Sequence, residues 1–419
     1  MFKLLSANRN LRNFALFSTF YGIGRGMFTM FMMWAVHAMF QTPMYTGLAG
    51  LMFSVPLIAS FIVGPFVDKW NKVSVLRVVE FVKLCMTSLI LVGHFFFDVG
   101  AWFYLTAILI FSIASLFGTP AQTALLPRII EGENIVKANA IIQMTGIVGG
   151  LSIGVVLYVL MQRGADFALV YAVNVAVVIF TLLFTVFMRS GESESDSPAL
   201  KSYASDLKKG FAFVCKGAML PVAFFMVSLT LFSEAAHVNF PMFAEVHLGT
   251  ATGYILLSAL AMLGSVVGSW IIGITASKFE LWKIIVATFA FAGVARIIFV
   301  STIANNVTIA ILIYILYTGL VSTIVILYRS LVQKLPPKNL VSRVDTIIAS
   351  LSAIAGALGA LVGGFLGTHL HNIDYVFFIQ GSSYIVIGIL LCISKNIRQL
   401  PKITELGNDD DSDQDTTGG

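Results

Sequence analysis

The residues best suited to chemistry in this chain of 419 residues are charged side chains that lie inside long apolar segments. Arg25 and Glu234 each interrupt such a segment, and His237 follows Glu234 within one helical turn. If these segments cross a membrane, each embedded charge costs at least about 2.5 to 3.5 kcal/mol, so it persists only when it is paired, hydrated or functional. An embedded carboxyl group near a basic side chain is suited to ion pairing and to proton exchange.

Other embedded charges favour a structural interpretation. Arg77, Glu80 and Lys83 recur at three-residue spacing, so we expect them along one side of a helix. A structural ion pair near the membrane surface is the favoured interpretation of this group, and a functional role is the alternative. Arg296 lies in a later apolar segment, where we expect it to pair inward or to extend its charged end toward the surface. Contact between Arg296 and a substrate is the alternative.

Composition indicates which elements position these residues. Hydrophobic residues make up 58% of the chain and charged residues 11%, which leaves more apolar surface than a soluble protein can bury. One bilayer crossing takes about 20 helical residues. The apolar runs predict twelve membrane-spanning helices, near residues 13–39, 45–67, 74–97, 102–126, 138–160, 167–188, 219–245, 252–276, 283–303, 307–332, 344–368 and 375–393.

The charges outside these spans set the orientation of the chain. Basic residues fall almost entirely on one side of the predicted membrane, with only Arg163 on the other, which places both termini in the cytoplasm.

The predicted fold is an all-α membrane protein with twelve transmembrane helices in two six-helix bundles. The predicted domains are an N-terminal bundle at 1–188, a cytoplasmic linker with an interfacial helix at 189–218, a C-terminal bundle at 219–394 and an acidic, disordered cytoplasmic tail at 395–419.

The two halves also resemble each other in sequence. A shift of about 209 residues lays 64–69 over 273–278, and a shift of about 206 lays 124–128 over 330–334. Weak repeats of this kind are typical of transporters whose substrate site lies between the halves, near the membrane midplane.

Arg25 and Glu234 share the first of these offsets, because 234 minus 25 is 209. We therefore expect them at equivalent positions in the two halves, facing one another or a common water-filled site. In one interpretation the ion pair is remade during a transport cycle and Glu234 couples to protons. In the other it is a static pair that locks the outer ends of the helices together.

One loop carries a family resemblance. The sequence Gly-Pro-Phe-Val-Asp-Lys-Trp-Asn-Lys at 64–72 resembles the Gly-x-x-x-Asp-Arg/Lys loop between the second and third spans of the major facilitator superfamily. The segments 117–128 and 134–140 are similar to the region after span four in the branch that contains bacterial macrolide-efflux and siderophore-export permeases. The resemblance implies alternating access between two bundles, with helices one, four, seven and ten lining a central cavity.

The same resemblance implies a cytoplasmic gating loop made by Gly64, Asp68, Lys69 and Lys72. The alternative is that the basic residues only set the topology, and this is the favoured interpretation for Lys72. Asp68 is expected near the positive end of span eleven, where a carboxylate gains roughly 0.3 to 1 kcal/mol. The chain departs from the family in three places. Span four has no charged residue, span five lacks the family's proline, and Arg25 stands where relatives place an acidic residue. The first two departures weaken a proton-antiport assignment.

Uncharged and weakly basic side chains complete the expected cavity. Aromatic and methionine side chains form a large, adaptable surface for amphipathic compounds, although the same residues are also ordinary packing in a membrane bundle. The candidates are Tyr21, Phe28, Met32, Gln122, His237, Asn239, Tyr314, Tyr317 and Tyr328.

Several function classes are disfavoured. No nucleophile–base constellation, metal-ligand spacing or phosphate loop is present, so we expect no enzyme activity, no metal and no cofactor. The sequence has no basic block that would indicate nucleic-acid binding.

The leading hypothesis is a monomeric exporter of amphipathic small molecules, such as a macrolide-like antibiotic or a siderophore, driven by the proton gradient across a bacterial cytoplasmic membrane. Uptake symport or flipping of a lipid-linked substrate is the alternative within transport, and a non-transporting receptor or scaffold is the alternative from another class.

Overall fold

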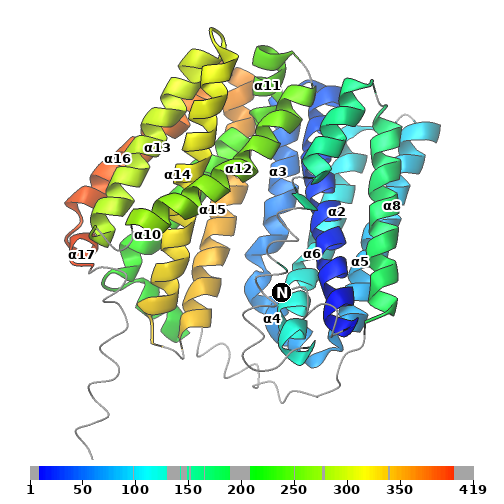
Figure 1. Ribbon diagram of the computed structural model, residues 1–419, viewed down its shortest axis with the longest axis horizontal. Helices are drawn as coiled ribbons and strands as arrows, with labels where there is room; N and C mark the ends of the chain where they lie inside the picture. Colours follow the sequence, from blue (N-terminus) through cyan, green and yellow to red (C-terminus); the bar gives the residue numbers. More distant parts are fainter. Residues whose placement is uncertain are drawn as a thin grey trace, which may run out of the picture. The chain divides into compact units, whose positions relative to one another are not determined.

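The computed structural model describes residues 9–97, 99–129, 142, 149–150, 152–164, 166–188, 208–249, 251–275, 279–337 and 340–400, apart from the side chains of 61, 64–66, 68, 127–128 and 251. These residues are helical except for short turns (Figure 1). The chain divides into two compact units, Met1–Leu200 with Phe240–Ala259, and Lys201–Asn239 with Leu260–Gly419. This division differs from the predicted domains because residues 240–259 group with the first unit.

The first unit is built from helices that pack side by side along most of their length. α5 packs against α6 and α8, and α2 packs against α8. A shorter apolar helix runs from Ser152 to Gln162. The unit's labelled helices are α2 (Arg9–Phe40), α3 (Pro43–Ile58), α4 (Ser60–Lys69), α5 (Lys72–Phe96), α6 (Ala101–Ile129), α8 (Phe167–Val186), α11 (Phe240–Leu248) and the first part of α12 (Ala251–Thr275).

The second unit contains two especially close helix pairs, α10 with α15 and α13 with α16. Glycine allows the first of these contacts, because a Cβ atom on Gly363 would collide with the carbonyl oxygen of Ala235. Besides the rest of α12, the helices are α10 (Met219–His237), α13 (Leu281–Ile303), α14 (Val307–Lys334), α15 (Val341–His369), α16 (Asp374–Ile393) and α17 (Lys395–Arg398).

Two predicted spans are broken rather than continuous. The span at 45–67 divides at Ala59 into α3 and α4, three residues after Pro56, which removes a helical donor and crowds the preceding turn. The span at 219–245 divides between α10 and α11, where Pro241 is the second residue of the new helix. Apolar runs show the length of a crossing but not such breaks.

Membrane crossing is supported for much of the chain. Among the described residues, eight helices are long and apolar enough to cross a membrane. α2 and α5 are long enough but more polar, and α5 carries the Arg77, Glu80 and Lys83 charges. Much of the first half of the predicted span at 138–160 lies outside the described residues, so twelve spans remain a prediction.

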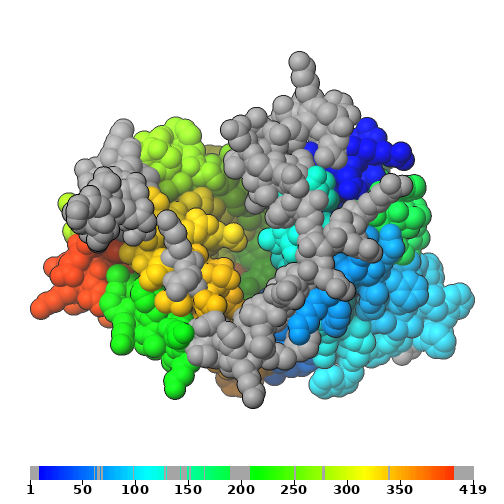
Figure 2. Space-filling model, turned by 90° about the horizontal axis from the view of Figure 1, so that it is seen from below, coloured from blue at the N-terminus to red at the C-terminus, as the bar shows by residue number. Residues whose placement is uncertain are grey.

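The linker and the tail are described only in part. Residues 208–214 are helical, with Phe211 exposed and Val214 buried, so an interfacial helix and a solvated linker helix both stay predictions. The start of the predicted tail forms α17 instead, and Asn396 donates a hydrogen bond to the Gly217 carbonyl at 2.9 Å. In Figure 2 the green residues after 208 lie beside the red end of the described chain. Residues 189–207 and 401–419 lie outside the described residues.

Candidate functional site

A buried ion pair lies on α5 in the first unit. Lys83 Nζ donates to Glu80 Oε1 at 3.0 Å, and each side chain is only 2% exposed. Arg77, expected on the same side of the helix, is exposed instead, and its Nη2 donates to the Thr185 carbonyl of α8. Three residues turn a helix by about 300°, so side chains at this spacing drift by about 60° per step. The pair is therefore Glu80 with Lys83, while Arg77 joins α5 to α8.

Aromatic rings from two neighbouring helices cover the Lys83 ammonium group. Its Nζ lies 3.7 Å from the ring centroid of Tyr21 on α2 and 5.2 Å from that of Phe111 on α6. Phe111 stacks on Phe28 of α2 at a centroid distance of 3.7 Å. The predicted cavity residues Tyr21 and Phe28 thus belong with the ion pair. We call these five residues, Tyr21, Phe28, Glu80, Lys83 and Phe111, the Lys83 cluster.

Within and next to the Lys83 cluster, some of the described polar atoms lack a hydrogen-bond partner. The Tyr21 hydroxyl points at α6, where a Cβ atom on Gly118 would collide with it. Gln122 follows Gly118 by one helical turn. Within the described part of the chain, Tyr21 Oη and Gln122 Nε2 are buried without a hydrogen-bond partner. Polar atoms inside a membrane bundle need a partner, a water molecule or a bound ligand.

A second titratable pair in this unit was not predicted. His37 Nε2 on α2 lies 2.5 Å from Glu245 Oε2 on α11, and the His37 side chain is almost fully buried. The Trp34 ring packs against His37, and it also stacks on Tyr254. A signal for this pair was available, because 245 minus 37 is 208, close to the repeat offset that linked Arg25 with Glu234.

Arg296 in the second unit turns inward, as one of the two expectations for it required. Its side chain is 3% exposed, and its guanidinium carbon lies 4.7 Å from the ring centroids of both Tyr317 and Phe377. Gln380 Nε2 donates to the Tyr317 and Tyr384 hydroxyls, each at 3.1 Å. The Tyr384 hydroxyl is also 2.6 Å from Ser233 Oγ on α10. A polar network therefore runs from α16 to α14 and to the residue before Glu234.

Glu234 lies near the end of α10 with its side chain half-buried. Its Oε2 is 3.5 Å from His237 Nδ1 in the next turn. Asn239, expected in the cavity, is fully buried and donates to the carbonyls of Ala235 and Gly363, each at 2.8 Å. These two bonds favour a packing role for Asn239 over a cavity role. Arg25 is exposed in α2 of the other unit, so its pairing with Glu234 stays a prediction.

Comparison with known proteins identifies the family. The family model described as Major Facilitator Superfamily matches residues 14–360. The chain belongs to the major facilitator superfamily. This is a family of membrane transporters rather than enzymes, with a multi-pass helical fold. A search of curated proteins found no match.

Solved structures of other transporters share the superfamily fold. A mutant form of the nucleoside transporter NupG has a TM-score of 0.76 at 13% identity, covering 91% of this chain and 98% of the other. A D-xylose-proton symporter has a TM-score of 0.71 at 12% identity, covering 94% and 99%. A mutant peptide transporter POT in complex with alafosfalin has a TM-score of 0.72 at 12% identity, covering 94% and 96%. At these identities the likeness shows the fold alone.

The predicted gating loop is described in part. Gly64 and Asp68 lie in α4, but the Asp68 side chain is outside the described part of the structure. Lys69 is exposed, whereas Lys72 is 1% exposed and its Nζ donates to the Trp70 carbonyl at 2.9 Å. The gating role of these residues therefore stays a prediction.

The remaining cavity candidates are buried within their own units. Met32 accepts a hydrogen bond from the Tyr171 hydroxyl at 3.5 Å. Tyr314 packs on Phe299, and the Tyr328 hydroxyl donates to Asp345 Oδ1 at 3.2 Å. Among the described residues, no three His, Cys, Asp or Glu side chains converge on a point where a metal ion would bind.

Proposed function

We propose that this chain is a secondary active transporter that exports amphipathic small molecules by alternating access, by proton antiport. The Lys83 cluster is the observation that supports this best. It places a buried ion pair against the rings of Tyr21 and Phe111, with the unused polar atoms of Tyr21 and Gln122 nearby. Rings and a few polar groups in an apolar bundle suit a compound with a large apolar body and some hydrogen-bonding groups.

The class of cargo follows from the resemblance of segments 117–128 and 134–140. The favoured cargo is a drug or macrolide-like antibiotic, and a siderophore is next. The proposed location is the cytoplasmic membrane of a bacterium, with both termini in the cytoplasm. The proton gradient supplies the energy, and the transporter acts as a monomer.

Proton coupling is assigned to acidic residues next to histidines. Glu234 beside His237 is the first candidate, because an embedded carboxyl group can alternate between a charged and a neutral form. His37 with Glu245 is a second candidate in the other unit. Proton-coupled uptake is the alternative direction of transport, since one similar structure is that of a D-xylose-proton symporter.

The experiment is substrate-dependent proton movement in proteoliposomes of defined orientation. Amphipathic drugs and siderophore-like compounds are screened against the natural chain, Glu234→Gln and Glu245→Gln. We expect a compound to move against the direction of proton flow, and this coupling to be lost in Glu234→Gln. A compound that crosses with no proton signal would refute antiport, and co-directional movement would establish uptake symport instead. Coupling that survives in Glu234→Gln but is lost in Glu245→Gln would move the proton site to the His37 pair.

A further inference from the structure

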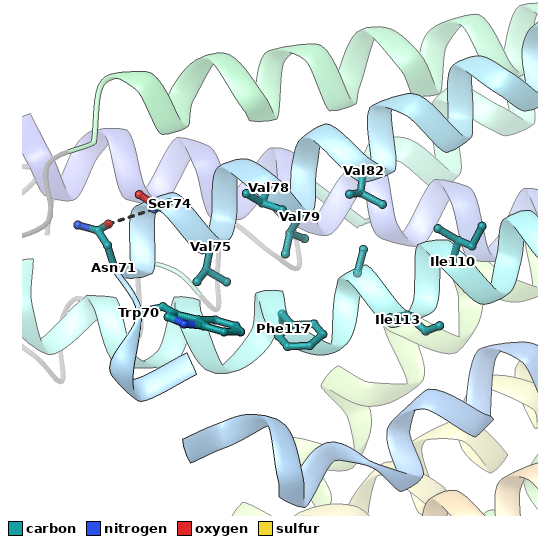
Figure 3. A pocket seen from close by; sticks show the side chains of 11 residues that line it. Trp70, Asn71, Ser74, Val75, Val78, Val79, Val82, Ile110, Ile113 and Phe117 are labelled. Atoms are coloured by element: carbon teal, nitrogen blue, oxygen red, sulfur yellow. Dashed lines mark hydrogen bonds between the residues drawn. The ribbon is translucent and has the colours of Figure 1, made fainter. Parts of the chain in front are cut away.

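An apolar groove opens on the surface of the first unit between α5 and α6. Its volume is about 590 Å³. Val75, Val79 and Val82 of α5 form one wall, and Ile110 and Phe117 of α6 form the other (Figure 3). Trp70 closes one end, where its ring stacks on Phe117 at a centroid distance of 6.3 Å.

The groove is polar only at this same end. Asn71 and Ser74 lie beside Trp70, and every other lining residue is apolar. Asn71 caps α5 by accepting a hydrogen bond from the Ser74 amide. Lys69, which directly precedes Trp70, is exposed. One end of the groove is therefore polar, with the exposed Lys69 next to Trp70 in the chain, and the rest is hydrocarbon.

The length of the groove matches one membrane leaflet. Asn71 and Val82 are eleven residues apart on a helix that rises 1.5 Å per residue, so the lined part of α5 is about 16 Å long. The hydrocarbon core is about 30 Å thick, and half of it is about 15 Å. Tryptophan favours the boundary between headgroups and chains, which fits Trp70 at the polar end.

The exposure of the walls indicates what fills the groove. Val78 is 62% exposed and Ile113 is 44% exposed, on helices that belong to a membrane-spanning bundle. Lipid chains are the surrounding solvent of such a face. We expect one ordered acyl chain in this groove rather than exchanging boundary lipids. If the groove stayed empty, the apolar side chains on each wall would lose van der Waals contacts.

We propose that this groove binds one acyl chain of an anionic phospholipid, with the headgroup at the Lys69 end. The positive-inside pattern predicts that this end faces the cytoplasm. The proposal rests on the membrane-spanning bundle and is independent of the transported compound. Trp70 reports on the site directly, since its ring forms part of the lining.

Fluorescence quenching tests the proposal. The chain has five tryptophans, so single-tryptophan proteins that keep Trp70 or Trp102 are made by replacing the others with Phe. Trp102 is 68% exposed at the start of α6, outside the groove, and reports on ordinary boundary lipid. Both proteins are reconstituted in phosphatidylcholine and titrated with phosphatidylglycerol that carries brominated acyl chains. We expect Trp70 to be half-quenched at an about five-fold lower mole fraction of brominated lipid than Trp102, because one basic residue attracts anionic lipid to about this extent.

Two variants separate the parts of the proposal. Ala114→Leu fills the groove, and it should raise the Trp70 midpoint to that of Trp102, whereas Thr106→Leu on the exposed side of α6 should leave it unchanged. Lys69→Gln keeps the lining intact and should remove the preference for anionic over zwitterionic brominated lipid. Equal midpoints for Trp70 and Trp102 would overturn the site. A low midpoint that is the same for both headgroups would overturn the anionic headgroup.

Discussion

Removing Lys83 should destabilise the first unit more than any other single charge removal on α5. Glu80 and Lys83 are each 2% exposed and 3.0 Å apart, so Lys83→Met leaves a carboxylate buried without its ammonium partner. Breaking a buried pair in this way costs about 3 to 5 kcal/mol. The variant also loses the contact between Lys83 and the Tyr21 ring, and such a desolvated contact is worth about 2 kcal/mol. We therefore expect a loss near the upper end of that range.

A double variant makes this prediction sharper. Glu80→Gln/Lys83→Met replaces the stranded carboxylate with a neutral amide, so it should be more stable than Lys83→Met alone. Glu80→Gln alone keeps an acceptor for Lys83 and the aromatic contacts, and should cost about 1 to 2 kcal/mol. Arg77→Met is the matched control, because it removes an exposed charge that has one hydrogen bond to α8, and it should cost about 1 to 2 kcal/mol.

The measurement is the free energy of unfolding in mixed micelles titrated with a denaturing detergent, under conditions where refolding is complete. The decisive quantity is the coupling energy of the double-mutant cycle. If the losses of Glu80→Gln and Lys83→Met simply add in the double variant, the two residues do not stabilise each other and the buried pair is refuted. The same holds if Lys83→Met costs no more than Arg77→Met.

Three further predictions concern other contacts. Gly363→Ala should clearly lower the midpoint of thermal unfolding, because the added Cβ atom would collide with the Ala235 carbonyl. Gly22→Ala is the control, because its Cβ atom meets open space, and it should leave the midpoint unchanged. Equal midpoints for the two variants would argue against the close α10–α15 contact. Gly118→Ala should displace the Tyr21 ring and reduce transport in proteoliposomes, and full activity would remove Tyr21 from the site. His37→Phe should speed amide hydrogen exchange in α11 but not in α8, since Glu245 loses its partner, and unchanged exchange would show that the pair does not hold α11.

Much of the fold could be predicted because hydrophobicity fixes where helices cross. The predicted span at 283–303 is α13, Leu281–Ile303, and the span at 375–393 is α16, Asp374–Ile393. The breaks after Pro56 and before Pro241 were missed, although proline is a local signal for both. Periodicity shows little in a helix that is apolar all round, so it does not register these interruptions.

The candidate site was less predictable, because it depends on how each helix is rotated about its axis. Sequence spacing placed Arg77 with Glu80 and Lys83, but the drift of 3.6-residue turns puts Arg77 about 120° from Lys83, and its guanidinium donates to α8 instead. Asn239 was predicted as a cavity residue because its side chain is polar. In the structure its amide donates hydrogen bonds that join α10 to α15. His37 and Glu245 are far apart in sequence, and only the repeat offset linked them.

Each unit contains a buried cation against aromatic rings, on corresponding helices of the two halves. Lys83 lies over Phe111 in the first unit, and Arg296 lies over Tyr317 in the second. The rings are related by the sequence repeat, because 317 minus 111 is 206, the offset that aligned the ends of spans four and ten. The cations are related more loosely, since 296 minus 83 is 213.

This equivalence bears on the role of Arg296. In each unit the cation sits on the third helix of its half and contacts a ring on the fourth, α5 with α6 and α13 with α14. Each cation is almost fully buried and its ring partner lies on the next helix, so the contact joins two helices within one unit. Both cations therefore hold a helix against its neighbour, and the polar atoms near them, those of Tyr21 and Gln122 in particular, are better candidates for meeting a substrate.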